Sequence, residues 1–177
     1  MDYSEKLTKL SKFSSFSCDC EGMIVFHPSY EIDVTKVLLK LLHKGDIFID
    51  VGAHIGRYTL LASRRVGSEG LVVALEPIPD NYRVLVYNVR NNNANNVITL
   101  PIAAWNDETI LEFIVPPGKS GATAKDLYHF SGLKLRGRKV RSRAMRLDTL
   151  ILKILKLSKV DFLKIDVEGA EIEVLEG

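Results

Sequence analysis

The sequence has 177 residues, of which 46% are hydrophobic and 26% are charged. This length suits one domain with a sizeable hydrophobic core. No run of about 18 apolar residues occurs, and the charged first residues contain no apolar segment of signal-peptide length. The composition therefore argues against a membrane-spanning protein and predicts a globular protein of the cytoplasm.

The net charge of +2 hides an uneven distribution of basic residues. Residues 119–146 contain nine lysines and arginines and one acid, so the remainder of the chain is acidic overall. Such a basic segment could bind an anionic partner such as RNA, a phosphorylated sugar or a lipid-linked glycan. It could also be a solvated hairpin that turns Leu133, Leu135 and Val140 inward. The sequence leaves both interpretations open.

The only cysteines are Cys18 and Cys20. Their C-x-C spacing is too short for an ordinary disulfide, and two further ligands for a zinc ion are lacking. We therefore expect two ordinary thiols and no metal site.

The expected helices and strands alternate along the chain after an N-terminal extension at 1–30, and residues 31–177 are expected to form one domain. Helices are predicted where apolar residues recur at helical spacing, and strands where short apolar runs occur. The predicted elements are, in chain order, a helix at 31–43, a strand at 46–51, a helix at 57–63, a strand at 71–75, a helix at 80–92, strands at 97–103 and 110–115, a strand ending at 166, and a helix at 170–175. This alternation predicts an α/β fold with a doubly wound, mostly parallel sheet.

A glycine turn follows the first predicted strand. The segment 48–56 reads FIDVGAHIG, in which Asp50 ends the apolar strand and Gly52 and Gly56 bound the turn. Glycine allows positive φ and close approach of a ligand, and the N–H groups at the start of the next helix can receive polar ligand atoms. A strand, a glycine turn and a helix in this order predict a nucleotide-binding turn.

The second predicted strand also ends in a carboxylate. Glu76 lies 24 residues after Gly52 and is followed by Pro77. An acid near this spacing, at the tip of the second strand, can accept hydrogen bonds from ribose hydroxyls. The two strand ends together predict a cofactor that contains adenosine.

The pattern of glycines distinguishes between such cofactors. Dinucleotide-binding folds use G-x-G-x-x-G to bring a pyrophosphate against the start of a helix. Here His54 occupies the position of the second glycine, and no third glycine follows at the required spacing. A bulky residue at this position obstructs a pyrophosphate but not the smaller methionine part of S-adenosylmethionine. The turn therefore favours S-adenosylmethionine and a methyltransferase.

Four motifs occur in order along the chain. They are DVGAHIG at 50–56, Glu76-Pro77 with the following Asn81, Leu85 and Asn88, LDTL at 147–150, and KIDVEGAE at 164–171. In these motifs the sequence resembles the FkbM family of S-adenosylmethionine-dependent methyltransferases, from about residue 46 to the last residue. The resemblance implies a Rossmann-like class I methyltransferase fold and O-methylation of a hydroxyl on a sugar or another small metabolite.

The sequence departs from the family pattern in two respects. His54 stands where the family usually has asparagine, so its side chain can still form hydrogen bonds and can titrate near neutral pH. The other departure is length, because a class I methyltransferase sheet has seven strands and this sequence provides the first four and one additional strand. We therefore expect the domain to be incomplete at its C-terminus.

Several residues of the first three strand ends are candidates for cofactor binding. Glu76 is expected to accept both ribose hydroxyls. Asp50 is expected to order the glycine turn, where it could reach the cofactor's amino group through water or act only as a structural cap. The remaining candidates are Gly52, Ala53, His54 and Gly56 in the turn, Ile78 against the adenine face or in the core, and Ala103 and Ala104, whose backbone could contact adenine.

Asp166 and Glu168 are the candidates for catalysis. Asp166 ends the fourth strand, at the edge where doubly wound sheets bind ligands. Methyl transfer requires an aligned acceptor and, for a hydroxyl, removal of its proton, which a carboxylate can do. Asp166 could instead hold the methionine part of the cofactor, and Glu168 could cap the last helix. Glu171 and Glu173 are expected to be solvated helix residues.

Two other functions remain open from the sequence. An RNA methyltransferase is compatible with the basic segment, although no aromatic platform accompanies the charges and no N-P-P-Y motif for base amino groups occurs. A non-catalytic protein that binds cofactor or a partner without turnover is the third interpretation.

Overall fold

A computed structural model describes residues 31–117, 123–124 and 136–177. The predicted N-terminal extension, both cysteines and much of the basic segment lie outside these residues. The chain divides into two compact units between Leu41 and Leu42. Of the first unit, the structure describes the helix α2 (Ile32–Leu41). Within the described ranges, no helix combines the length and the apolar character that crossing a membrane requires.

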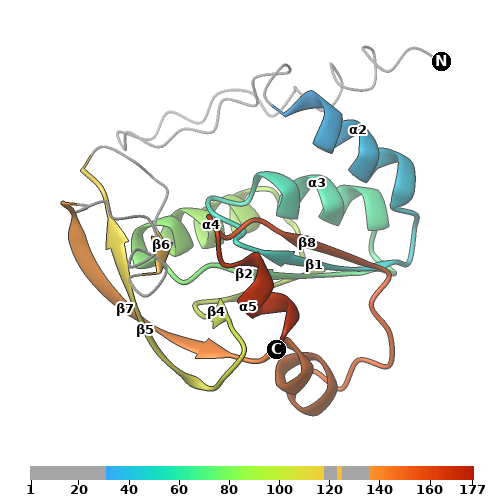
Figure 1. The fold of residues 1–177 in the computed structure, drawn as a ribbon. Helices are drawn as coiled ribbons and strands as arrows, with labels where there is room; N and C mark the ends of the chain where they lie inside the picture. Colours follow the sequence, from blue (N-terminus) through green and yellow to red (C-terminus); the bar gives the residue numbers. More distant parts are fainter. Residues whose placement is uncertain (1–30, 118–122, 125–135) are drawn as a thin grey trace. The chain divides into compact units, whose positions relative to one another are not determined.

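The second unit is built on a parallel sheet of four strands, β1 (Ile47–Val51), β2 (Leu71–Leu75), β3 (Val97–Leu100) and β8 (Phe162–Ile165). Their order is β3-β2-β1-β8, and every neighbouring pair is parallel. Strands β2, β1 and β8 are labelled in Figure 1. The carboxyl ends of all four strands therefore meet at one edge, which we call the carboxyl edge. The predicted parallel α/β sheet is confirmed.

Both faces of this sheet are covered by the second unit itself. On one face lie α3 (Arg57–Val66) and α4 (Pro79–Asn91). On the other face lie the helix η2 (Thr149–Ile154) and α5 (Glu171–Leu175). Alternate strand residues point to opposite faces, so each strand supplies both cores. The first core contains Ala53, Leu60, Ala74, Leu85 and Val89, and the second contains Ile49, Val51, Val73, Leu75, Leu147, Leu150 and Val174.

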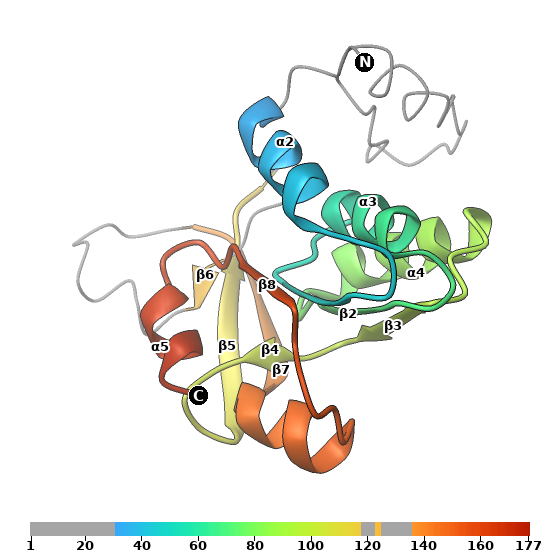
Figure 2. The ribbon, with the colours of Figure 1, turned by 90° about the vertical axis from the view of Figure 1, so that its right-hand side faces the viewer.

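A second sheet contains four further strands, with the order β4-β7-β5-β6. Its long strands β5 (Thr109–Val115) and β7 (Arg138–Met145) are antiparallel and lie side by side (Figure 2). The short strand β4 (Ala103–Ala104) runs parallel to β7, and β6 (Thr123–Ala124) pairs with β5. The sequence indicated β5 but not a separate sheet.

The predicted third strand at 97–103 is wrong in its extent. β3 ends at Leu100, and the chain then leaves the parallel sheet and enters β4 of the second sheet. Pro101 explains the break, because proline has no N–H to donate to a strand ladder. The Leu100 carbonyl accepts a hydrogen bond from the Glu76 N–H at 3.1 Å, and the pairing of β2 with β3 ends at this point.

Candidate functional site

The glycine turn is held over the end of β2 by its backbone. The N–H groups of Gly52 and Ala53 both donate to the Leu75 carbonyl, at 3.1 and 2.9 Å. The N–H of Gly56 donates to the Ala53 carbonyl at 2.9 Å, which closes the turn before α3. Gly52 and Gly56 have φ values of 75° and 96°, so the turn uses the left-handed conformations that glycine adopts at least cost.

Gly52 also meets the end of β8. A Cβ atom at this position would lie 1.9 Å from the carbonyl oxygen of Asp166. The Asp166 N–H donates to the Val51 carbonyl at 3.1 Å, so the two backbone segments are bonded directly beside this contact. The end of the fourth strand can therefore approach the glycine turn only because residue 52 has no side chain.

The carboxylate of Glu76 is buried at the tip of β2, where the side chain is 4% exposed. Its Oε2 accepts a hydrogen bond from the His54 N–H at 2.8 Å. Its Oε1 accepts one from the Ile78 N–H at 3.0 Å and a longer one from Asn81 Nδ2 at 3.3 Å. One carboxylate thus joins the glycine turn, the end of β2 and the start of α4.

These contacts shift the pKa of Glu76 in opposite directions. Burial raises the pKa of this carboxyl above its ordinary value because it disfavours the charged form. The hydrogen bonds from Ile78, His54 and Asn81 oppose the shift, and the nearby charge of Asp50 adds to it. The net direction is upward. An ionised carboxylate has about four acceptor positions, so three donors leave room for one more.

His54 contributes to this arrangement through its backbone. Its φ is 53°, in the left-handed region that asparagine, aspartate and histidine adopt more readily than other residues with a side chain. This conformation accompanies the hydrogen bond from its N–H to Glu76. Sequence reasoning considered the hydrogen bonding and titration of the His54 side chain and missed the backbone requirement, which histidine and the family's asparagine both meet.

A buried ion pair lies beneath the turn. Asp50 is fully buried, and its Oδ2 accepts a hydrogen bond from Thr59 Oγ1 of α3 at 2.6 Å. Lys164 of β8 lies directly across from Asp50 in the sheet, and its Nζ is 3.3 Å from Asp50 Oδ1. The same Nζ is 3.5 Å from Asp166 Oδ2, 3.5 Å from the Gly52 carbonyl oxygen and 5.2 Å from the centre of the Tyr58 ring.

Sequence reasoning assigned no role to Lys164, although it opens the KIDVEGAE motif. The lysine links three elements of the carboxyl edge, because it contacts the buried acid of β1, the backbone of the glycine turn and the acid that follows β8. A lysine inside an otherwise apolar strand was the available signal, since such a residue is rarely buried without a partner.

The two predicted catalytic acids differ in their surroundings. The Asp166 side chain is 57% exposed at the carboxyl edge, next to Lys164. Glu168 is exposed and has a φ of 55°. The proposed capping role of Glu168 is wrong, because α5 begins at Glu171 with Ala170 as its N-cap and without a side-chain cap.

Glu171 takes the role of holding this loop. Its Oε1 accepts hydrogen bonds from the N–H groups of Val167 and Gly169, both at 3.3 Å. Burial raises its pKa, but hydrogen bonds from its own N–H and those of Gly169 and Val167 outweigh this effect and lower it overall. The expectation of a merely solvated Glu171 is therefore wrong, and the side chain orders the segment that carries Asp166 and Glu168.

The residues predicted to meet adenine lie behind the tip of β2. Ile78 is 3% exposed and packs with Ala103, Phe113 and Val140 in a core between the α4 start and the second sheet. Ala104 belongs instead to the core beneath the parallel sheet. The structure thus brings Ile78 and Ala103 together and turns Ala104 away from them. Their contact with a ligand stays a prediction.

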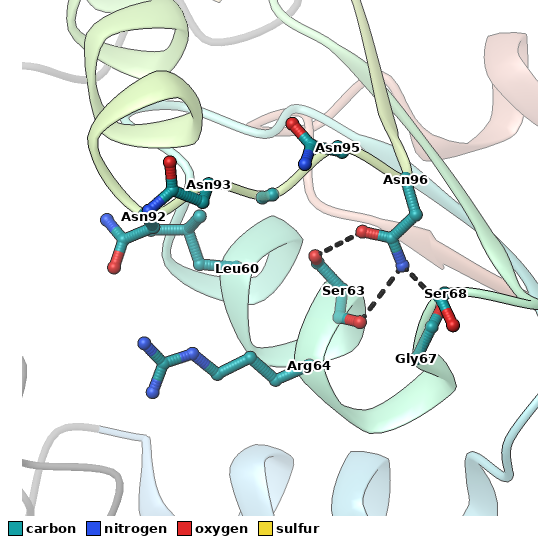
Figure 3. A pocket seen from close by; sticks show the side chains of 10 residues that line it. Leu60, Ser63, Arg64, Gly67, Ser68, Asn92, Asn93, Asn95 and Asn96 are labelled. Atoms are coloured by element: carbon teal, nitrogen blue, oxygen red, sulfur yellow. Dashed lines mark hydrogen bonds between the residues drawn. The ribbon is translucent and has the colours of Figure 1, made fainter.

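A cavity of about 250 Å³ lies near the amino ends of β2 and β3, at the edge of the sheet opposite the carboxyl edge. Figure 3 shows the side chains that line it. It is lined by the end of α3 and by the asparagine-rich turn before β3. Asn96 spans this turn, since its Nδ2 donates to the carbonyls of Ser63 and Gly67 at 3.0 and 2.7 Å and its Oδ1 accepts from Ser63 Oγ at 2.6 Å. These hydrogen bonds join the predicted polar turn to the end of α3. The turn thus has a structural role and lies away from the candidate site.

The strand order, the glycine turn and the buried acid at the second strand tip define a Rossmann-like α/β fold. The family comparison specifies the class further. Residues 50–177 match the model of the methyltransferase FkbM domain. This match covers most of the chain, and the chain belongs to the FkbM methyltransferase domain family. No curated protein matches the sequence significantly.

Solved structures of methyltransferases are similar to this chain. The FkbM methyltransferase of Methylobacillus flagellatus KT shares 15% identity, covering 80% of this chain and 35% of that one with a TM-score of 0.50, which shows a common fold. A SAM-dependent methyltransferase from Aquifex aeolicus shares 21% identity with this chain. The match covers 60% of this chain and 58% of that one, with a TM-score of 0.39. A protein-L-isoaspartate O-methyltransferase shares 27% identity with this chain. The match covers 41% of this chain and 23% of that one, with a TM-score of 0.38. The chain thus spans between 23% and 58% of these three structures.

The contact between Gly52 and Asp166 predicts a large penalty for Gly52→Ala. Gly45→Ala is the matched control, because Gly45 also has a positive φ of 84° but no atom within 4 Å of a Cβ. The control should lower the free energy of unfolding by about 1–2 kcal/mol through backbone strain alone. Gly52→Ala should cost at least about 2 kcal/mol more in urea-induced unfolding, since overpacking adds to the strain. Equal costs for the two variants would contradict the contact.

The buried ion pair predicts strong coupling between Asp50 and Lys164. Lys164→Met should lower the free energy of unfolding by about 3–5 kcal/mol, because it leaves a buried carboxylate without its cation. Asp50→Asn in the same chain should recover a large part of this loss. Urea-induced unfolding of the wild type, the two single variants and the double variant measures the coupling. Additive single and double effects would show that the two groups do not interact.

The raised pKa of Glu76 predicts a specific dependence of stability on pH. A carboxyl group whose pKa is higher in the folded than in the unfolded protein contributes stability that is present below its ordinary value of 4.5 and is lost as the pH rises through the folded value. The wild type should therefore lose stability relative to Glu76→Gln as the pH rises from below 4.5 toward neutrality. The measurement is urea-induced unfolding of both proteins across this range. If the difference in the free energy of unfolding between the two proteins stays constant with pH, or changes in favour of the wild type as the pH rises, the raised pKa of Glu76 is refuted.

Proposed function

We propose that the chain is the cofactor-binding part of an S-adenosylmethionine-dependent methyltransferase that methylates a hydroxyl on a sugar or another small metabolite. The observation that carries the cofactor assignment is the buried carboxylate of Glu76, joined to the glycine turn at the carboxyl edge of the sheet. Membership of the FkbM methyltransferase domain family supports the same reaction. The hydroxyl acceptor follows from the family resemblance.

Glu76 suits a ribose on chemical grounds. Its backbone donors at 2.8 and 3.0 Å come from the turn and from the segment after β2, so they belong to the fold itself. The donor from Asn81 is a side chain at the longer distance of 3.3 Å, and a ribose hydroxyl can replace it. With the remaining acceptor position, the carboxylate can then receive both hydroxyls of an adenosine ribose.

The glycine turn and Asp50 would serve the rest of the cofactor. Gly52, Ala53, His54 and Gly56 form the turn directly beside Glu76, where a small ligand can approach the backbone closely. Asp50 is enclosed by Thr59 and Lys164, so its role is to hold the turn and the end of β8 together. This favours the structural alternative for Asp50 over a direct contact with the cofactor.

When bound, the cofactor supplies a methyl group on a sulfonium, and the acceptor oxygen displaces the sulfur in line. The protein must align the acceptor and take its proton. Asp166 is the better placed of the two acids for this task, because its exposed carboxylate lies at the carboxyl edge and is held by Lys164 at 3.5 Å. Glu168 is exposed in the loop that Glu171 orders, where it can contact the acceptor.

The proposal predicts that the chain binds S-adenosylmethionine saturably and that Glu76→Ala weakens this binding at least about tenfold, as expected for the loss of charge-assisted hydrogen bonds. Isothermal titration calorimetry with S-adenosylmethionine measures both affinities. ATP and NAD serve as competing ligands of the same nucleotide class.

Glu69→Ala is the control, because Glu69 is an exposed acid that precedes β2 in the sequence, whereas Glu76 follows this strand. It should bind the cofactor as the wild type does. Unchanged affinity of a folded Glu76→Ala protein would remove the ribose assignment. Binding of NAD in preference to S-adenosylmethionine would remove the methyltransferase proposal.

A further inference from the structure

Strand β7 has one buried and one basic face. Val140, Ser142 and Ala144 point inward and are between 4% and 9% exposed. The alternating residues Lys139, Arg141 and Arg143 are exposed on the opposite face of the strand. We call these three residues the cationic strand face. The described part of the basic segment thus combines the two interpretations drawn from the sequence, because one side forms a core and the other presents charge.

Little of this charge is neutralised by the neighbouring strand. In the antiparallel pairing with β5, Lys139, Arg141 and Arg143 lie across from Ile114, Glu112 and Ile110. Glu112 pairs with Lys139 at 3.2 Å. Within the part of the chain that the structure describes, Arg141 and Arg143 form no ion pair. Asp107 and Glu108 lie in the turn that precedes β5, so they limit the face at its Arg143 end.

The spacing and chemistry of these residues suit a chain of phosphates. Alternate residues of a strand are about 7 Å apart on one face. This is comparable to the separation of successive phosphates in an extended single nucleic acid strand. The planar guanidinium group of arginine can bind phosphate oxygens with two parallel hydrogen bonds. Two arginines and a lysine in a row can therefore contact consecutive phosphates.

The contacts of β7 with the segment that follows Glu76 lie on its inner side, opposite the cationic strand face. Arg138, the first residue of β7, forms an ion pair with Asp80 at the start of α4. Asp80 comes four residues after Glu76. The inner side of β7 packs on Ile78 through Val140 and Ala144. Because successive residues of a strand alternate between its faces, these contacts with Asp80 and Ile78 belong to the side of β7 opposite the cationic strand face, and a ligand bound on that face leaves them in place.

We propose that the cationic strand face binds the sugar-phosphate backbone of a single-stranded RNA without reading its bases. The side chains across from it on β5 are two isoleucines and one glutamate, which offer no aromatic surface for base stacking. Recognition then depends on phosphate charge alone, which makes the binding independent of sequence and sensitive to salt. This inference goes beyond methyl transfer, because binding does not require the cofactor.

The test measures binding of a fluorescent single-stranded RNA homopolymer to the full chain by anisotropy over a range of salt concentrations. The wild type should bind at low salt, and its affinity should fall as a power of the salt concentration. Arg141→Gln with Arg143→Gln should bind more weakly and should reduce the slope of log affinity against log salt by about 1.4, since each single-strand phosphate contact contributes about 0.7.

The matched control removes the same charge elsewhere. Arg90→Gln with Lys153→Gln alters two exposed residues, at the end of α4 and in η2, and should keep the wild-type slope. An equal loss in both double variants would overturn the proposal, because it would reflect net charge only. Absence of RNA binding at low salt, or tighter binding of heparin than of RNA, would also overturn it, the latter in favour of an anionic glycan.

S-adenosylmethionine titrations of the same proteins separate this inference from the proposed function. Arg141→Gln with Arg143→Gln should bind S-adenosylmethionine as the wild type does, which also shows that the variant is folded. RNA binding by a chain that does not bind S-adenosylmethionine would leave the cationic strand face intact and would refute only the methyltransferase proposal.

Discussion

The arrangement of the carboxyl edge depends on the requirement that a buried carboxylate be hydrogen-bonded. Glu76 is 4% exposed, and burying an ionised group without partners is costly. Two of its partners are backbone N–H groups, from His54 in the glycine turn and from Ile78 before α4. The turn, the end of β2 and the start of α4 therefore take positions that keep these donors in reach.

A second group of charges connects the other side of the same edge. Lys164 lies between the buried Asp50 and the exposed Asp166, and it touches the carbonyl of Gly52. With Glu76, the edge carries three carboxylates and one lysine. The negative excess suits a cationic ligand, such as the sulfonium and ammonium groups of the proposed cofactor. The same residues thus stabilise the fold and set the charge of the candidate site.

The second sheet extends this edge with opposite charge. Its inner side shares a core with Ile78, and its outer side presents Lys139, Arg141 and Arg143. The chain therefore places an acidic site and a basic surface on connected elements, with the ion pair of Asp80 and Arg138 between them.

The sequence alone determined the parallel sheet, the glycine turn and the acid at the tip of β2. These features depend on local properties, namely runs of apolar residues and the backbone freedom of glycine, so the predicted strand at 71–75 and the strand within 46–51 agree with the structure. The FkbM resemblance was likewise available, because its motifs are contiguous.

Only the tertiary structure decided how the distant residues meet. Lys164 reaches Asp50 because β8 pairs with β1 across more than a hundred residues of sequence, and no local pattern encodes that contact. Tertiary packing also places β4 in a different sheet from β3. It likewise positions the Glu171 carboxylate to accept hydrogen bonds from the N–H groups of Val167 and Gly169. Hydrophobic periodicity therefore specified the elements, whereas the pairing of buried polar groups specified the site.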